Sequence, residues 1–105
     1  MRILSWNIRG CNNLLKKRLL KRKVEVERPS IVLLQETKCS GEKLKRITNR
    51  SWKRCEVMAV DAIGAAGRLA ILWNPKEVSL SDSRASRYDI TVSFHILGTN
   101  IRGTV

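Results

Sequence analysis

Two short apolar runs on either side of a basic, helix-forming segment constrain this chain more than any other feature. The first run covers residues 2–6, and the second begins Ile31-Val32-Leu33-Leu34. Residues 14–28 between them are mostly good helix formers, and Pro29 ends that segment because the residue before a proline avoids the α region. This order predicts a βαβ unit, in which strands 2–6 and 31–35 are adjacent and parallel and helix 14–28 packs on one face.

The expected helix has both apolar and basic positions. Leu15, Leu19, Leu20 and Val24 recur at helical spacing and predict an apolar stripe directed at the sheet. The Lys and Arg residues between positions 16 and 23 are interpreted as a solvated face that touches nucleic acid only incidentally.

The remainder of the chain predicts one further helix and several strands. The helix is expected from about residue 40 through Thr48, and strands at 55–60, 69–73, 78–80, 89–97 and from 100 onwards. A tight small-residue loop is expected at 64–67 and a hairpin turn at 98–100. Residues 1–105 therefore form at most one domain, of the α/β class. Because the chain stops inside or just before a strand, we expect it to be truncated at its C-terminus.

Asn7 and Glu36 each place a polar side chain at the carboxyl end of an expected strand. In open α/β sheets, ligands bind at that end. If the two strands are neighbours, an amide and a carboxylate converge on one point, which suits a hard divalent cation together with a phosphate oxygen. The alternative for each residue is an ordinary role in a turn or loop.

Charge and hydropathy narrow the classes of partner. The chain has 21 Lys and Arg against 9 Asp and Glu, a formal net charge of +12. That excess favours a polyanion, RNA or DNA, over a merely solvated basic surface. No apolar run approaches the roughly 20 residues that span a bilayer, and the start of the chain does not read as a signal peptide. We therefore expect no membrane partner and an intracellular location.

The three cysteines are odd in number and lack the spacing of metal ligands. Cys11, Cys39 and Cys55 are expected to be reduced, unpaired thiols.

Three segments resemble one known family in order and spacing. The segments are Ile3-Leu4-Ser5-Trp6-Asn7-Ile8-Arg9-Gly10, Leu33-Leu34-Gln35-Glu36-Thr37-Lys38, and Gly64-Ala65-Ala66-Gly67-Arg68-Leu69-Ala70-Ile71-Leu72-Trp73-Asn74-Pro75. They are similar to motifs of the endonuclease/exonuclease/phosphatase superfamily, whose fold is like that of pancreatic deoxyribonuclease, and most of all to the N-terminal endonuclease domain of plant LINE-type retrotransposon polyproteins. The resemblance implies the N-terminal half of a four-layered α-β-β-α sandwich.

The resemblance also implies roles for single residues. Asn7 and Glu36 correspond to catalytic residues that hold Mg²⁺ (or Mn²⁺), with weak binding expected in this chain. Lys38 corresponds to a lysine near the phosphate, and Arg9 is grouped with it as substrate-binding. Arg9 stands where apurinic-site endonucleases carry an Asp, which favours the retroelement branch over a DNA-repair enzyme.

Several features of the family are missing. Its later motifs, with a catalytic Tyr, an Asp-Asn pair and a final Asp-His, have no counterpart, and the only histidine, His95, matches none of them. Arg68 also stands where the family's small-residue loop usually has a second glycine.

Three functions follow from these patterns. The first is a fragment of a Mg²⁺-dependent DNA endonuclease domain of retrotransposon origin, with little or no activity alone and a nuclear location if it follows the retroelement. The second is a basic, non-catalytic nucleic-acid-binding remnant. The third, a phosphoesterase for small substrates, is disfavoured by the charge and by Arg9. Because the missing half is expected to supply the second sheet, self-association through an exposed sheet face is also expected.

Overall fold

The computed structural model describes residues 2–11, 13–61, 68–85, 90–98 and 102–104. The loop expected at 64–67 and part of the turn expected at 98–100 lie outside these residues. In chain order the elements are β1 (Ile3–Asn7), α1 (Leu14–Glu27), β2 (Ile31–Gln35), α2 (Gly41–Ser51), β3 (Glu56–Asp61), β4 (Arg68–Trp73), β5 (Val78–Ala85), β6 (Ile90–Ile96) and β7 (Arg102–Thr104).

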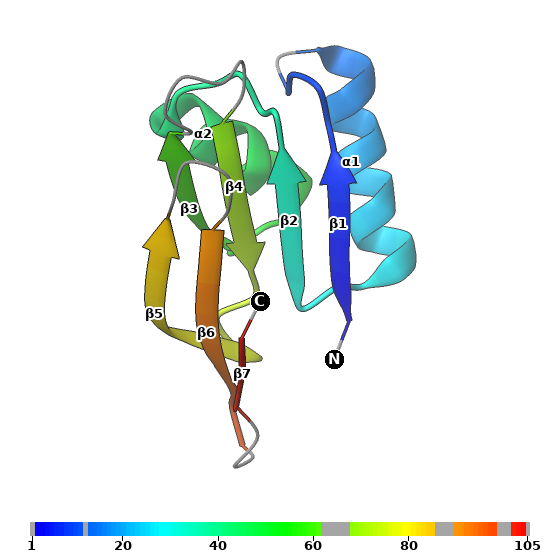
Figure 1. The fold of residues 1–105 in the computed structure, drawn as a ribbon. Coiled ribbons are helices and arrows are strands. Elements are labelled where there is room, and N and C mark those ends of the chain that lie inside the picture. Colours follow the sequence, from blue (N-terminus) through cyan, green and yellow to red (C-terminus); the bar gives the residue numbers. More distant parts are fainter. Residues whose placement is uncertain (1, 12, 62–67, 86–89, 99–101, 105) are drawn as a thin grey trace.

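The βαβ unit at the start of the chain is confirmed. Strands β1 and β2 pair in parallel, with Ile3 opposite Ile31 and Asn7 opposite Gln35. Strand β4 is antiparallel to both β2 and β3, and the sheet order is β1-β2-β4-β3 (Figure 1). Strand β2 is therefore an interior strand, which explains its nearly continuous apolar sequence.

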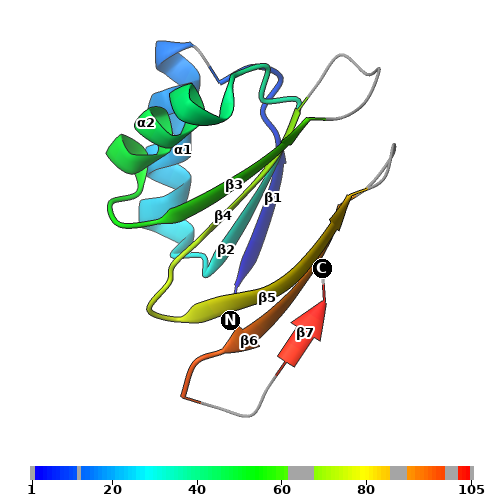
Figure 2. The ribbon, with the colours of Figure 1, turned by 90° about the vertical axis from the view of Figure 1, so that its left-hand side faces the viewer.

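Both helices cover one face of this sheet, and a second sheet covers the other (Figure 2). Side chains alternate along β2, so Val32 and Leu34 pack in the core under the helices while Ile31 and Leu33 pack toward the second sheet. In that second core Ile31 contacts a cluster that includes Phe94 of β6. The chain thus supplies a helix layer and two sheet layers of the expected sandwich, and the expected fold class is confirmed.

The expectation that the second sheet would be missing is wrong. Strands β5, β6 and β7 form a three-stranded antiparallel sheet within this chain. A turn at Asn74 leads directly from β4 into β5, since the amide of Val78 donates to the Asn74 carbonyl oxygen at 3.0 Å. The expected bare face is therefore reduced to the neighbourhood of β1, where Ile3 is 43% exposed while Ile31 beside it is only 2% exposed. Self-association stays a prediction.

The expected apolar stripe of α1 is only half right. Leu20 and Val24 are buried, but Leu15 is 65% exposed and Leu19 is 38% exposed. With 3.6 residues per turn, Leu15 lies about 140° around the helix from Leu20 and cannot face the same core. The inward positions one turn before Leu20 are occupied by Lys16 and Lys17, which are partly buried. Their alkyl stems pack inward while their ammonium groups reach the surface, where Nζ of Lys16 donates to the Arg9 carbonyl oxygen.

The helix ends follow from local chemistry. The Asn13 side chain accepts a hydrogen bond from the Leu15 amide at 2.8 Å and caps α1, and the Ser40 hydroxyl accepts one from Lys43 at 3.3 Å and caps α2. Arg28 adopts a left-handed conformation before Pro29, so α1 ends one residue earlier than expected. In the part of the chain that the structure describes, neither helix has the length and apolarity needed to cross a membrane.

The different burial of two leucines on α1 can be tested directly. Leu20→Ala should lower the free energy of unfolding by about 2–5 kcal/mol, because it leaves a cavity in the core. Leu15→Ala, the same change on the same helix, should alter it by no more than about 0.5 kcal/mol. Urea denaturation followed by circular dichroism measures both. Equal losses would mean that the rotation of α1 described here is wrong.

Candidate functional site

The carboxyl ends of β1 and β2 meet at one edge of the first sheet and carry the residues singled out in the sequence. Asn7 is the last residue of β1 and is exposed, on the sheet face opposite that of Leu4 and Trp6. Glu36 follows directly after β2 and is partly buried. Strand pairing thus brings the two residues to the same edge, as expected. The convergence of their two side chains on one point stays a prediction.

Backbone hydrogen bonds continue the parallel pairing beyond the strands. The Ile8 amide donates to the Gln35 carbonyl oxygen at 3.1 Å. Further along, the Gly10 amide donates to the backbone carbonyl oxygen of Glu36 at 2.6 Å, and the Cys11 amide donates to that of Thr37 at 2.9 Å. Because these loops are joined to each other, the residues in them have defined positions despite lying outside regular structure.

The same loops contain an unusual concentration of left-handed backbone. Arg9, Glu36 and Lys38 have φ angles of 52°, 53° and 54°. Each such residue costs about 1–3 kcal/mol, and such strain clusters at functional sites because the surrounding structure must maintain it. Gly10 has φ 97°, and a Cβ added there would lie 3.9 Å from Cδ of Lys38. The Lys38 stem therefore lies against Gly10, which places it beside the loop that carries Arg9.

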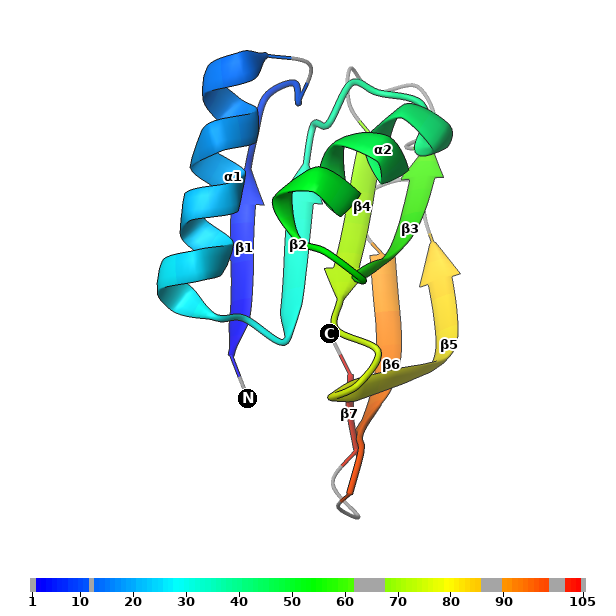
Figure 3. The same ribbon diagram turned by 180° about the vertical axis from the view of Figure 1, so that it is seen from behind.

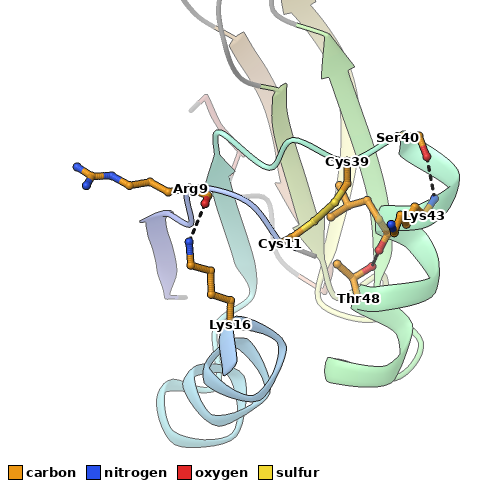
Figure 4. The surroundings of a disulfide bond; sticks show 8 residues. Arg9, Cys11, Lys16, Cys39, Ser40, Lys43 and Thr48 are labelled. Carbon is orange, nitrogen blue, oxygen red and sulfur yellow. Dashed lines mark hydrogen bonds between the residues drawn. A yellow bond between two sulfur atoms is a disulfide. The ribbon is translucent and has the colours of Figure 1, made fainter. Parts of the chain in front are cut away.

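A disulfide and a lysine hold the loops from the side of the helices. Cys11 and Cys39 form a disulfide, and Nζ of Lys16 donates to the Arg9 carbonyl oxygen at 2.7 Å (Figure 4). The disulfide joins residues 28 apart. Closing a loop of that length stabilises a folded chain by about 3 kcal/mol in the chain-entropy model.

The expectation of three reduced thiols is therefore wrong for Cys11 and Cys39. Cys55 is free and buried, and burial raises the pKa of its thiol. A signal for the pairing was present in the sequence, since each paired cysteine lies four positions beyond the facing residues Asn7 and Gln35. Two parallel strands that continue in register bring such positions together.

The oxygen atoms expected to hold a magnesium ion have no other partner among the described residues. Neither the Glu36 carboxylate nor the side-chain amide of Asn7 has a hydrogen bond or ion pair there, and the only described salt bridge joins Arg2 to Glu27. Within the same residues no group of three or more His, Cys, Asp or Glu could hold a metal. Magnesium keeps several waters and is often held by one or two carboxylates, so the donor types are compatible with weak binding, and the metal site stays a prediction.

Three further side chains belong to the two loops at this edge. Arg9 and Lys38 are exposed on the two loops, so the structure places both expected phosphate contacts at the same edge as Glu36. Sequence reasoning missed Thr37, which is fully buried and whose Oγ1 has no described hydrogen-bond partner.

His95 lies in β6 of the second sheet, opposite Ser79, as its predicted strand position implied.

Several solved structures that are distant in sequence have a similar fold. The catalytic domain of human Nocturnin matches with a TM-score of 0.73 at 12% identity, over 99% of this chain and 47% of that one. An endonuclease/exonuclease/phosphatase family protein from Bacteroides thetaiotaomicron matches with a TM-score of 0.69 at 14% identity, over 97% of this chain and 47% of that one. TDP2 from D. rerio, in complex with a single-strand DNA product, matches with a TM-score of 0.68 at 17% identity, over 97% of this chain and 43% of that one.

These likenesses show that the chain has the fold of the endonuclease/exonuclease/phosphatase superfamily, so the resemblance found in the sequence is confirmed at that level. The chain spans less than half the length of each of these proteins. No protein-family model matches the sequence, and neither does any curated protein.

Cysteine labelling tests the pairing beside the site. Iodoacetamide should modify no cysteine in the native protein, because two are bonded and burial keeps the Cys55 thiol protonated. After denaturation without a reductant, mass spectrometry should find one modified residue, Cys55. After denaturation with a reductant it should find three. Three modified residues without the reductant would contradict the disulfide.

Proposed function

We propose that this chain is the N-terminal half of a magnesium-dependent phosphodiesterase domain, of the DNA endonuclease kind and of retroelement origin, with little or no activity alone. The observation that carries the proposal is the joined pair of loops after β1 and β2. They bring Glu36, whose carboxylate has no partner among the described residues, to one edge of the sheet together with Asn7 and the two cations Arg9 and Lys38. Such an edge provides acceptors for a cation beside donors for a phosphate.

Each residue has a distinct role in this proposal. Glu36 is the direct ligand of the metal, and Asn7 holds the metal together with the scissile phosphate. Lys38 and Arg9 donate hydrogen bonds to phosphate oxygens, and the left-handed backbone at both positions sets the direction of their side chains. When bound, the ion neutralises charge that develops on the phosphate.

The low activity follows from the groups that the chain lacks. Phosphodiester hydrolysis also needs a positioned water and a group that accepts its proton. The only histidine of the chain, His95, lies in the second sheet and matches no family motif. Losing a general base alone slows a reaction by about a hundred- to ten-thousand-fold.

Nucleic acid is the substrate class that the charge supports. The net charge of +12 suits a polyanion better than a small phosphoester. The TDP2 structure, which contains a single-strand DNA product, supports DNA for proteins of this fold. Arg9, in place of the Asp of apurinic-site endonucleases, supports the retroelement branch, such as plant LINE elements, and with it a nuclear location.

A second candidate is a nucleic-acid-binding remnant without catalytic function. The observation that favours it is the excess of cations, most of which have no ion pair within the described residues. A remnant of this kind binds DNA in a salt-dependent manner but does not use Glu36. Metal binding at Glu36 therefore separates the two candidates.

Paramagnetic broadening by Mn²⁺ tests the metal site without requiring activity. In a ¹⁵N-labelled sample, Mn²⁺ should broaden the amide signals of Asn7 and Glu36 first. Glu36→Gln should remove this local broadening, because it removes the carboxylate ligand. Glu25→Gln, which neutralises an exposed carboxylate on α1, is the matched control and should change nothing there. Broadening that persists in Glu36→Gln would refute the role of Glu36.

Nicking of supercoiled plasmid tests the expected lack of activity. The purified chain with Mg²⁺ should produce no nicked circles above the background of a metal-free control, because the base and the positioned water are not supplied. Robust nicking that disappears in Glu36→Ala would show that this half contains a complete site, contrary to the proposal.

A further inference from the structure

A groove between α1 and α2 lies on the outer surface of the helix layer. Both helices lie on the face of the first sheet that is turned away from the second sheet, and Figure 3 views them from that side. The groove has a volume of about 440 Å³. Its charged lining consists of Lys17, Arg18, Lys21, Lys43, Arg46 and Arg50.

The two helices present these cations at regular spacing. On α1, Lys17 and Lys21 are one turn apart, and on α2, Lys43, Arg46 and Arg50 recur at three- and four-residue intervals. Residues at such intervals share one face of a helix. The groove is thus formed by a basic face on each helix, which the earlier interpretation as one solvated face of α1 did not recognise.

Among the described residues, no acidic side chain lines the groove. The salt bridge described in this structure, between Arg2 and Glu27, lies elsewhere, so no described ion pair neutralises these cations. Like charges on facing helices repel, and the repulsion is relieved only by counterions or by an anionic ligand.

Packing keeps the two basic faces together in spite of this repulsion. Ile47 of α2 and Leu20 of α1 belong to the same buried core. The Ser51 hydroxyl at the end of α2 donates to the Lys17 carbonyl oxygen at 3.4 Å. Because the core fixes the distance between the helices, the groove exists before any ligand binds, and binding requires no rearrangement of the backbone.

We propose that this groove binds the phosphodiester backbone of duplex DNA, independently of sequence and of the metal site. The six described cations of the groove, with no described acid beside them, match a chain of phosphates by charge. A duplex is favoured over a single strand because none of the described lining residues is aromatic, and single-strand sites rely on aromatic side chains on which bases stack. Contacts to phosphates alone position DNA without reading its sequence.

The chain offers a closely matched pair of variants. Lys21→Gln with Arg46→Gln removes two groove cations, one from each helix. Arg22→Gln with Lys45→Gln removes one lysine and one arginine from neighbouring positions on the same helices, outside the groove. All four side chains are exposed, so both variants should keep the thermal unfolding temperature of the unmodified protein.

The experiment measures fluorescence anisotropy of a labelled duplex of about 20 base pairs over a series of salt concentrations. EDTA is present throughout, so the result does not depend on the metal site or on the proposed function. In the groove variant, affinity at low salt should fall at least tenfold, and the slope of log K against log salt should become shallower by about 2. In the control variant, affinity should fall less than threefold.

Two results would overturn the proposal. Equal losses in both variants would mean that net charge, and not the groove, binds DNA. Tighter binding of a single-stranded probe than of the duplex would contradict the assignment to duplex DNA. If the first groove variant unfolds, Lys43→Gln with Arg50→Gln on α2 repeats the test within the same groove and is judged by the same criteria.

Discussion

The parallel pairing of β1 with β2 is the interaction on which the remaining structure depends. It requires a crossover, which α1 provides, and it makes β2 an interior strand once β4 pairs on the other side. Its hydrogen bonds continue through Gly10 and Cys11 into the loops. Together with the Cys11–Cys39 disulfide, that continuation maintains the left-handed backbone at Glu36 and Lys38, because such conformations persist only where neighbouring structure enforces them.

The basic charge of the chain is distributed in two different ways. At the sheet edge, Arg9 and Lys38 accompany the Glu36 carboxylate, so cations and an acid occur together. Between the helices, six cations line the groove with no acid among the described lining residues. The first arrangement suits a phosphate that shares a metal with the protein, while the second suits phosphates that are only held. A chain with both can contact one polyanion in two ways, with different dependence on metal and on salt.

The sequence correctly predicted the features that depend on short residue patterns and on the order of the strands along the chain. The βαβ unit, the common edge of Asn7 and Glu36 and the superfamily fold all followed from apolar runs and motifs. The prediction was wrong where spacing alone permits several answers. Leucines at 15, 19, 20 and 24 fit one broad stripe, but only contact with the sheet decides that Leu20 and Val24 turn inward.

Longer-range features were harder to predict. An odd cysteine count suggested free thiols, whereas the register of β1 against β2 pairs Cys11 with Cys39. The groove could not be predicted from the sequence, because it depends on how two helices are placed relative to each other. The pattern of a single helix does not give that placement. The strands of the second sheet were expected from the sequence. The sheet itself was missed because these strands were not assigned to a separate layer.

The candidate edge is formed entirely from residues 7–38, a single βαβ unit. Pairing two parallel strands across a crossover closes a long loop before any contact forms, so such pairing is slow compared with the formation of a helix or a hairpin. Strand β2, which carries Glu36 at its end, is also paired with β4 on its other side. We therefore expect the common edge of Asn7 and Glu36 to form together with the whole sheet. A substitution in β4, which contributes no residue to this edge, can for that reason still displace Glu36.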